Sequence, residues 1–280
     1  MSNSWTSAAS LTAEQRLDVL NLLNRTEAVL GREAIDEGSR RIVVHGWKAE
    51  HWLRHLEGNL EGYALLAGSE HPTIEMCGGR FDQDLLNAVL KVHPQVDWWK
   101  RDSHLIEHGT VIRTLQMMRT PLPVDVVDVP AGATLRAFEP RRDEDTWLQQ
   151  NNAAFAHHPE QGAWLLCDLE ERIDEPWFDP SGFLLLEIDG RLAASCWTKV
   201  HELHPDRFGE IYVISVHPDF QGRDLGRIMV TQGLASLRKK GVSSAVLFVD
   251  QSNTIASKLY ESLGFVVERE DNLVRFTAAT

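Results

Sequence analysis

Cysteine is scarce in this sequence and is never closely paired. Cys77, Cys167 and Cys196 stand far apart in a chain of 280 residues, and none of them belongs to a Cys-x-x-Cys motif. This spacing supports neither a structural zinc site nor a disulfide framework. We therefore expect a protein that holds no metal and works in the reducing cytoplasm.

Positive charge is also in short supply. The chain carries 28 lysines and arginines against 41 aspartates and glutamates, which gives a net charge of −13. Nucleic-acid binding depends largely on the neutralisation of phosphates by lysine and arginine, so this balance argues against a nucleic-acid partner. A negative net charge commonly serves solubility, and that is enough to explain it here. The negative field of the protein would also favour a cationic amine as substrate.

Long apolar runs are missing as well. No segment approaches the ~20 apolar residues that a membrane-spanning helix needs. The opening residues, MSNSWTSAAS, contain neither the basic nor the apolar region of a secretory signal. We expect a cytoplasmic monomer that acts on a small molecule and has no membrane partner.

The chain is long enough for two domains, each with a core of its own. The segment 120–132, TPLPVDVVDVPAG, has three prolines and no helical period, so it has the character of an interdomain linker. The sequence predicts a first domain at 1–122, a linker at 123–132 and a second domain at 133–280.

The two halves show the same order of predicted elements, which suggests a duplication. In the first half we expect helices at 12–30, 34–44 and 82–92, and strands at 52–56, 63–67, 73–77, 96–100 and 111–119. In the second half we expect helices at 143–155, 163–173, 226–240 and 253–263, and strands at 134–138, 183–188, 192–200, 211–216, 245–249, 265–268 and 274–277. The strands at 183–188 and 192–200 are joined by Asp-Gly, a strong hairpin signal.

The halves differ where chemistry is expected. Alignment of residues 103–107 with 257–261 places Ile106 opposite Tyr260. The first half has only Gly-Gly-Arg at 78–80 where the second half has a long glycine-containing loop. The first domain would therefore lack both a phosphate site and a phenol, and we expect it to be non-catalytic.

The strongest local pattern is the segment 209–227, GEIYVISVHPDFQGRDLGR. A β-branched run that ends before Pro218 predicts a buried strand, and a helix follows the loop. The loop carries Gly222 and Arg223, and Arg227 comes next in the helix. Backbone N–H groups of such a loop and the positive end of the helix form a site for phosphate oxygens, to which the arginines add charge-assisted donors.

By itself this loop could be a solvated turn, and it matches neither the P-loop nor the dinucleotide-binding pattern. The string QGRDLGR, preceded by Val-x-Pro and followed by a helix, resembles the pyrophosphate loop of the GNAT acetyltransferase superfamily. The resemblance implies that acetyl-CoA is the co-substrate.

Acetyl transfer from a thioester to an amine needs a base for the ammonium proton and an acid for the leaving thiolate. Glu210 opens the predicted strand and His217 ends it. Both are candidate bases, and so is a water molecule. Each side chain could equally be a solvated residue of a strand end or loop. Tyr260 is the candidate acid, because a phenol (pKa about 10) can lend a proton to a thiolate (thiol pKa about 8.5) and recover it. The alternative for Tyr260 is a purely structural place in the core.

Several longer segments together resemble the mycothiol synthase family of tandem GNAT enzymes. They are NNAAFAHHPEQGAW, EPWFDPSGF, WTKVH and VDQSNTIASKLYESLGF. The resemblance is strong over 134–280 and thinner over 1–120, where it rests on LTAEQR and the second helix. It implies an α/β (α+β) fold of two tandem GNAT-like domains, each a mixed, mostly antiparallel sheet flanked by helices. It also implies acetylation of the cysteinyl amine of cysteinyl-glucosaminyl-inositol, which yields mycothiol.

The resemblance also implies roles for individual residues. Contacts to acetyl-CoA fall on the backbone of Ile214, Ser215 and Val216, on the loop residues Gln221, Gly222, Arg223, Asp224, Leu225, Gly226 and Arg227, and on the helix start at Asn253, Thr254, Ile255, Ala256, Ser257 and Lys258. Contacts to the sugar substrate fall on Glu37, Glu160, Lys199, Glu210 and Phe248, and Tyr260 becomes the general acid.

Two departures from the family pattern bear on these roles. Phe248 stands where the family often has a tyrosine, so one hydroxyl contact to the substrate is expected to be missing. His217 stands where the family usually has a carboxylate implicated as the base, which leaves the base unassigned between Glu210, His217 and water.

Two other functions fit part of the pattern. The same chemistry could act on a peptide or protein N-terminus or on another small amine. A non-catalytic acyl-CoA sensor is the alternative from a different class, although Tyr260 argues against it for the second half.

Overall fold

The computed structural model describes residues 4–68, 71–78, 82–101, 109–156, 163–202 and 207–278. These residues form two compact units. Unit 1 holds the described residues up to Leu115 and from Glu270 onward, and unit 2 holds those between Gln116 and Arg269. The sequence placed the division in the proline-rich segment 120–132, whereas the unit boundaries lie inside two long strands, β6 (Thr110–Pro121) and β12 (Val266–Thr277).

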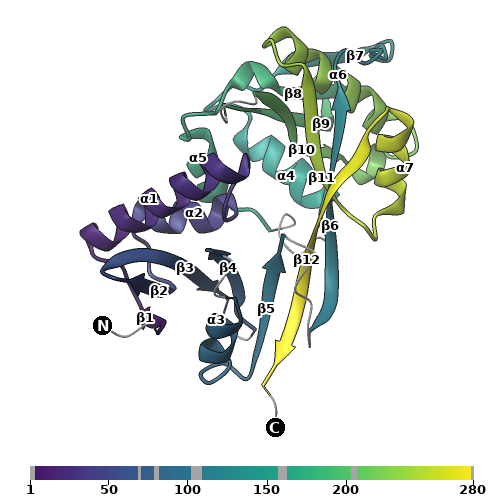
Figure 1. Cartoon of the computed structure of the whole chain (residues 1–280). Helices are drawn as coiled ribbons and strands as arrows, with labels where there is room; N and C mark the ends of the chain where they lie inside the picture. The colour runs from purple at the N-terminus through teal and green to yellow at the C-terminus, as the bar shows by residue number, and fades with distance from the viewer. Residues whose placement is uncertain are drawn as a thin grey trace. The chain divides into compact units, whose positions relative to one another are not determined.

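Unit 1 is a sheet covered by helices on both faces (Figure 1). Its strands run in the order β1 (Thr6–Ala8), β2 (Glu50–Leu56), β3 (Asn59–Ala67), β4 (Thr73–Cys77), β5 (Gln95–Lys100) and β12. Neighbours are antiparallel apart from the parallel pair of β4 and β5. Helices α1 (Ala13–Leu30) and α2 (Glu37–His45) cover one face, and α3 (Asp82–Val89) covers the other.

Local chemistry fixes the ends of α1. The side chain of Thr12 accepts a hydrogen bond from the backbone N–H of Gln15, and the Gln15 side chain accepts from the N–H of Thr12. This is the predicted capping box. Gly31 ends the helix with a φ of 65°, a left-handed conformation that glycine adopts without strain. None of the helices in the described part of the chain is both long and apolar enough to cross a membrane.

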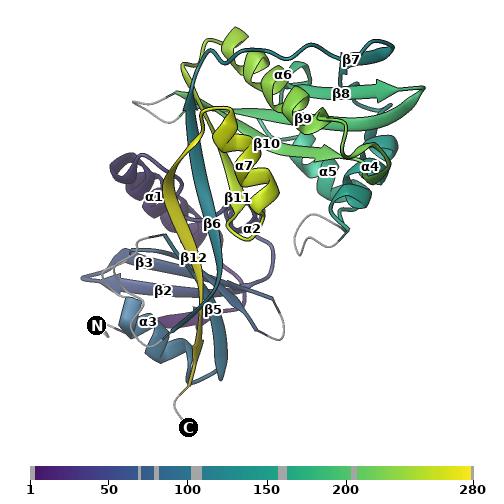
Figure 2. The ribbon, with the colours of Figure 1, turned by 90° about the vertical axis from the view of Figure 1, so that its right-hand side faces the viewer.

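Unit 2 is also a sheet between two layers of helices (Figure 2). Its strands run in the order β6, β11 (Ser244–Asp250), β10 (Phe208–Val216), β9 (Arg191–His201), β8 (Phe183–Ile188) and β7 (Ala133–Ala137). Helix α6 (Leu225–Lys239) packs on one face, whereas α4 (Glu144–Ala154) and α5 (Leu166–Ile173) pack on the other. Helix α7 (Thr254–Ser262) follows β11 along the chain.

The two faces of this sheet bury different side chains. On the α6 face, aliphatic residues of α6 such as Met229 and Leu234 pack against β9 and β10. On the α4 face the core is aromatic, and the Trp197 ring stacks on Phe183 with centroids 4.4 Å apart. Trp197 and Phe183 are both fully buried. These tryptophans and phenylalanines are therefore core residues of the second half.

The predicted elements are present, and two differences stand out. The turn Asp189-Gly190 joins β8 to β9 with both φ angles positive, as a two-residue hairpin requires. The sequence predicted strands at 265–268 and 274–277, but the structure has the single strand β12, so that prediction was wrong. The polar residues between them are held by neighbours in the sheet, and Asn272 accepts a hydrogen bond from Thr114 Oγ1 at 2.7 Å. The short strand β1 was not predicted.

We predict that Gly233→Ala destabilises unit 2. A Cβ at this position of α6 would lie 2.5 Å from Cys196 Sγ and 2.9 Å from Ile211 Cδ1, so helix and sheet would have to separate. The clash should outweigh the gain of up to ~1 kcal/mol in helix propensity. Thermal unfolding should show a lower Tm for this variant. Gly226→Ala in the same helix meets only Leu259 Cδ2 at 3.3 Å and should lower the Tm less.

Candidate active site

Two parallel strands of unit 2 are paired at one end and open at the other. In the described residues, β10 pairs with β11 at Gly209 with Ala245 and at Glu210 with Val246. Beyond Glu210 the residues of both strands line a cavity of about 1200 Å³. A β-bulge between Ile211 and Val213 shifts the register of β10 against β9 at the same point. Because the strands stop pairing after Glu210 and β10 bulges at the same point, the backbone N–H and C=O groups on the β11-facing edge of β10 are available to a ligand.

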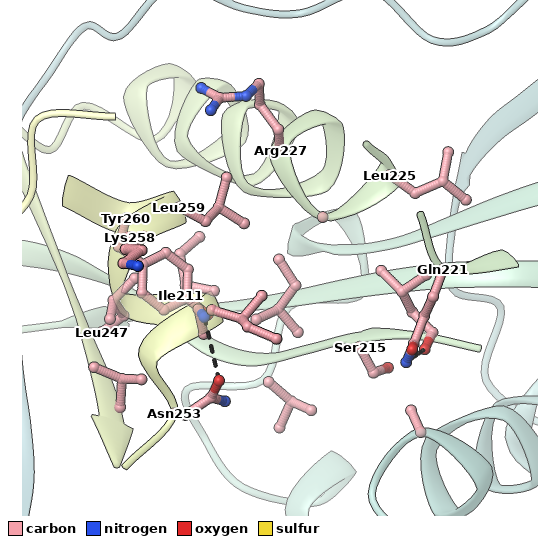
Figure 3. Close-up of a pocket in the computed structure, with 18 of the residues that line it drawn as sticks. Ile211, Ser215, Gln221, Leu225, Arg227, Leu247, Asn253, Lys258, Leu259 and Tyr260 are labelled. Atoms are coloured by element: carbon pink, nitrogen blue, oxygen red, sulfur yellow. Dashed lines mark hydrogen bonds between the residues drawn. The ribbon is translucent and has the colours of Figure 1, made fainter. Parts of the chain in front are cut away.

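The cavity is lined by residues of α4, β10, α6, β11 and α7 and of the loops that precede α6 and α7 (Figure 3). Residues of the predicted acetyl-CoA set that line it are Ile214, Ser215, Val216, Gln221, Gly222, Asp224, Leu225, Gly226, Arg227, Asn253, Ile255, Ala256 and Lys258. Of the predicted catalytic and substrate residues, Tyr260 and Phe248 line it too.

The N-terminus of α6 opens into this cavity. Gly222 has a φ of 75° and Asp224 a φ of 57°, so the loop turns sharply before the helix begins. The Asp224 side chain makes no capping hydrogen bond, and the first N–H of the helix ladder is that of Ile228, which donates to Asp224 O. The preceding N–H groups and the helix dipole therefore offer a site for an anion such as a phosphate.

Arg223 of the loop and Arg227 of α6 have different surroundings. Arg227 lines the cavity, and its Nη2 donates to Ser262 Oγ at 2.8 Å. Arg223 lies with its guanidinium 5.1 Å from the centre of the Phe220 ring. Arg223 is not among the described residues that line the cavity. Arg227 is thus the better placed of the two to meet a phosphate.

A second helix N-terminus borders the same cavity. Asn253 caps α7 by accepting a hydrogen bond from the N–H of Ala256 at 3.2 Å, the dashed line in Figure 3. Ser257 Oγ donates to the Asn253 carbonyl. Within the described residues Ser257 and Thr254, both predicted ligand contacts, lie outside the cavity lining.

Tyr260 of α7 is a buried phenol at the cavity wall, with an exposed fraction of 7%. Burial, aided by the nearby Cys196 thiol, raises the pKa of Tyr260 above its ordinary value. Burial likewise raises the pKa of the Cys196 thiol to about 12. Both groups therefore stay protonated near neutral pH. Tyr260 holds the proton that a donor needs, while its raised pKa makes it a weaker acid than a free phenol.

Glu210 precedes the lining residue Ile211 on β10 but does not itself belong to the described lining of the cavity. Its Oε2 is 2.5 Å from His201 Nε2, and Lys199 is its cross-strand neighbour. Burial would raise the pKa of Glu210, but the hydrogen bond and charge of His201, with Lys199, outweigh it and leave the pKa below its ordinary value. Glu210 is thus held as a carboxylate, a state that suits an anionic anchor better than a strong base.

His217 is occupied by its own turn. It caps the 3₁₀ helix Pro218–Phe220, and its Nδ1 accepts a hydrogen bond from the N–H of Asp219 at 3.2 Å. The other ring nitrogen of a neutral His217 then carries the proton. Because His217 is also outside the described cavity lining, this geometry favours the structural alternative for it.

The remaining predicted substrate residues are dispersed. Lys199 is buried, with its Nζ 4.6 Å from the Trp177 ring centre and 5.6 Å from that of Tyr212. Phe248 is 40% exposed. Glu37 is the first residue of α2 in unit 1, and Glu160 lies outside the described residues, as do Ile106 and residues 79–80.

Sequence reasoning missed several lining residues. Tyr212 belongs to the predicted strand, but the bulge that frees it from regular pairing leaves no signal in the sequence. Ala154 and Phe155 lie at the end of α4, inside the helix predicted at 143–155, but no ligand role was predicted for them. Ile211, Val213, Leu247, Val249, Asp250, Ser252, Leu259 and Ser262 complete the lining.

Strands β10 and β11 separate at the cavity, and a glycine-containing loop and a helix N-terminus follow β10. This arrangement defines an acyltransferase of the GNAT class. The Acetyltransferase (GNAT) family matches residues 139–265. Two solved structures share the fold over 99% of this chain. One is a tandem GNAT protein from the clavulanic acid biosynthesis pathway (TM-score 0.67, 13% identity, 99% of its chain). The other is a GCN5-related N-acetyltransferase from Sphaerobacter thermophilus (TM-score 0.65, 20% identity, 96% of its chain). These likenesses confirm the predicted α/β tandem fold.

Relatives with higher identity narrow the class. The mycothiol acetyltransferase of Streptomyces coelicolor is 38% identical over 95% of this chain and 93% of its own. That of Thermobispora bispora is 50% identical over 74% of this chain and 76% of its own. The chain belongs to the mycothiol acetyltransferase family, as the resemblance in its sequence indicated, and it is an acetyltransferase.

We predict that Glu210 makes stability depend on pH in the acid range. Because its folded-state pKa is lowered, its contribution is fully present above the ordinary glutamate pKa of about 4.3. It is lost as the pH falls further, through the lower pKa of the folded protein. Urea unfolding between pH 3 and pH 6 should show a shallower pH dependence for Glu210→Gln than for the wild type.

Glu202→Gln is the matched control for this test. The Glu202 side chain is 67% exposed and pairs with Arg207 at the surface, so its removal should leave the pH dependence unchanged. An equal pH dependence in the wild type and Glu210→Gln would contradict the assignment of Glu210 as an ionised, His201-bound carboxylate.

Proposed function

We propose that this protein transfers the acetyl group of acetyl-CoA to the cysteinyl amine of cysteinyl-glucosaminyl-inositol, which yields mycothiol. The observation that carries the proposal is the cavity of about 1200 Å³ in unit 2, which combines an open strand edge, two helix N-termini and the Tyr260 phenol. Membership of the mycothiol acetyltransferase family supports the acceptor.

The residues present fit an acyl-CoA. The uncapped start of α6, with Gly222 and Arg227, suits the pyrophosphate. The strand edge at 214–216 suits the amide groups of the pantetheine chain, because an unpaired edge offers N–H and C=O groups in alternation. Apolar wall residues such as Leu247 and Leu259 exclude water from the reacting groups.

The reaction joins the amine nitrogen to the thioester carbon and breaks the C–S bond. The attacking amine must be neutral, so the ammonium proton leaves first, and the thiolate of CoA takes up a proton afterwards. Tyr260 is the proposed donor of that proton, because its buried hydroxyl stays protonated and borders the cavity. The phenol recovers its proton from solvent after product release.

Glu210 is proposed to attract and orient the acceptor rather than to remove its proton. A carboxylate held ionised by His201 stabilises a nearby cation, whereas its lowered pKa makes it a weak base. Water is then the proposed route for the ammonium proton. His217, bound to the N–H of Asp219, has no part in this scheme.

Unit 1 is proposed to be non-catalytic. Its described residues form a smaller cavity of about 250 Å³ beside β5. Two cations at that cavity are already matched by acids, Lys100 by Asp82 and Arg101 by Glu75. Arg227 of unit 2 is also paired, with Asp224 Oδ2 at 3.5 Å, but it adjoins a helix start that no side chain caps, and this helix start is what favours unit 2.

We predict that the purified protein releases CoA when it is given acetyl-CoA and cysteinyl-glucosaminyl-inositol. Thiol release can be followed with a chromogenic disulfide after correction for the substrate thiol, and the acetylated product can be identified by mass spectrometry. Tyr260→Phe should lower kcat by about 10²-fold or more, the usual contribution of a general acid, and leave the KM for acetyl-CoA nearly unchanged. A wild-type rate no higher than that of Tyr260→Phe would refute the role of Tyr260.

We predict that the acceptor preference separates this function from acetylation of peptides. The ratio of kcat/KM values measures specificity, so the sugar substrate should be compared with a panel of peptides that begin with cysteine, serine or alanine. We expect the sugar substrate to exceed every peptide by at least about 10³-fold, because a site built for hydroxyl groups rejects acceptors that leave its polar groups unpaired. A peptide of equal kcat/KM would favour the alternative function.

A further inference from the structure

Behind Ser215 lies a closed triangle of polar atoms. Ser195 Oγ and Ser215 Oγ are 2.9 Å apart, and they lie 3.1 and 3.0 Å from Gln150 Oε1. Trp147 Nε1 donates to Ser195 Oγ at 3.0 Å. All four side chains are buried, with exposed fractions of 5% or less. Gln150 Nε2 is buried too, but it has no hydrogen-bond partner among the described residues.

With Gln150 Oε1 facing both hydroxyl groups, the triangle has too few protons for its three hydrogen bonds. Three sides joining three oxygen atoms need three protons, and two hydroxyl groups supply only two. A 180° rotation of the Gln150 amide resolves the deficit, because its NH₂ group then donates to both hydroxyl oxygens. After the rotation the carbonyl oxygen occupies the buried place that has no hydrogen-bond partner. An unpaired carbonyl oxygen costs less free energy than two unpaired N–H groups.

This arrangement fixes the direction of every remaining proton. Ser195 Oγ accepts from Trp147 and Gln150, so both of its lone pairs are used and its own proton goes to Ser215. Ser215 Oγ then accepts from Gln150 and Ser195. The proton of Ser215 is therefore left over, with no acceptor inside the triangle.

The cavity offers an acceptor position for that proton outside the triangle. Ser215 is one of the lining residues, and Figure 3 draws its side chain at the cavity wall on β10. A hydroxyl whose lone pairs are both used can donate and cannot accept, so it selects for an acceptor atom in the ligand.

We propose that the Ser215 hydroxyl donates a hydrogen bond to a carbonyl oxygen of the acyl-pantetheine chain of the acyl donor. The proposal rests on the acyl-CoA site assigned to this cavity and goes beyond it by naming a side chain that binds the ligand. Gln150, Ser195 and Trp147 are positioning residues that hold the donor in one direction. If the acceptor is the thioester carbonyl, the bond strengthens as negative charge develops on that oxygen during the reaction.

The test is the binding of acetyl-CoA and of free CoA to Ser215→Ala, measured by calorimetry without the acceptor. Loss of one neutral hydrogen bond should weaken binding about 5-fold. Weaker binding of acetyl-CoA alone identifies the thioester carbonyl, since CoA lacks it. Equally weaker binding of both ligands identifies a pantetheine amide, and either result supports the proposal.

Infrared spectroscopy gives an independent readout of the same bond. With acetyl-CoA labelled with ¹³C at the thioester carbonyl, the carbonyl stretch should move to higher frequency in Ser215→Ala if Ser215 donates to that oxygen. It should stay in place if a pantetheine amide is the acceptor. Ser195→Ala disturbs the same triangle but keeps the Ser215 proton, so it should leave the carbonyl frequency unchanged.

Ser195→Ala is the matched control. It removes a hydroxyl from the same triangle but leaves Ser215 with its outward proton, so it should weaken binding less than Ser215→Ala does. Similar losses for both variants would mean that the triangle only holds the strands and α4 together, and would overturn the proposal.

Two further outcomes are decisive. A folded Ser215→Ala that binds both ligands within twofold of the wild type overturns the proposal, and so does one that binds CoA alone more weakly. If Ser215→Ala does not fold, Ser215→Cys keeps the shape with a weaker donor and takes its place. A wild type that binds no acetyl-CoA would instead refute the proposed function.

Discussion

Most of what unit 2 can do depends on where the parallel pairing of β10 and β11 ends. The pairing holds at Gly209 and Glu210 and gives way to the cavity beyond them. In a parallel pair both strands point the same way, so the helices that follow them begin at the same edge. The parallel direction of the two strands is therefore enough to place the N-termini of α6 and α7 at one cavity.

Two ionisable groups near this opening are driven to opposite states by their surroundings. Tyr260 is buried beside a thiol and stays neutral, whereas Glu210 is buried beside His201 and stays charged. Burial disfavours the charged form of both groups, so the partner decides the result. The strand that carries Glu210 also carries Ser215, which means that a small shift of β10 would disturb the electrostatics and the hydrogen bonds together.

The sequence revealed features that are contiguous along the chain and missed those made across strands. The glycine-containing loop before α6, the capping box at Thr12 and the Asp189-Gly190 turn all depend on neighbours within a few residues. The partner of Glu210 is His201 on the adjacent strand, and the Gln150 triangle joins residues 45 and 65 positions apart. Hydrophobic periodicity does not report contacts between strands. For the same reason the sequence predicted two strands in place of β12, because the partners of its central polar residues lie on other strands.

Strand β12 has a consequence for the order in which the protein is completed. It leaves unit 2 at Arg269 and then pairs with β5 at the edge of the sheet of unit 1. A ribosome delivers residues 270–277 after every residue of unit 2, so the unit that begins first must wait for its sixth strand. Until then the edge of β5 that β12 will cover is unpaired.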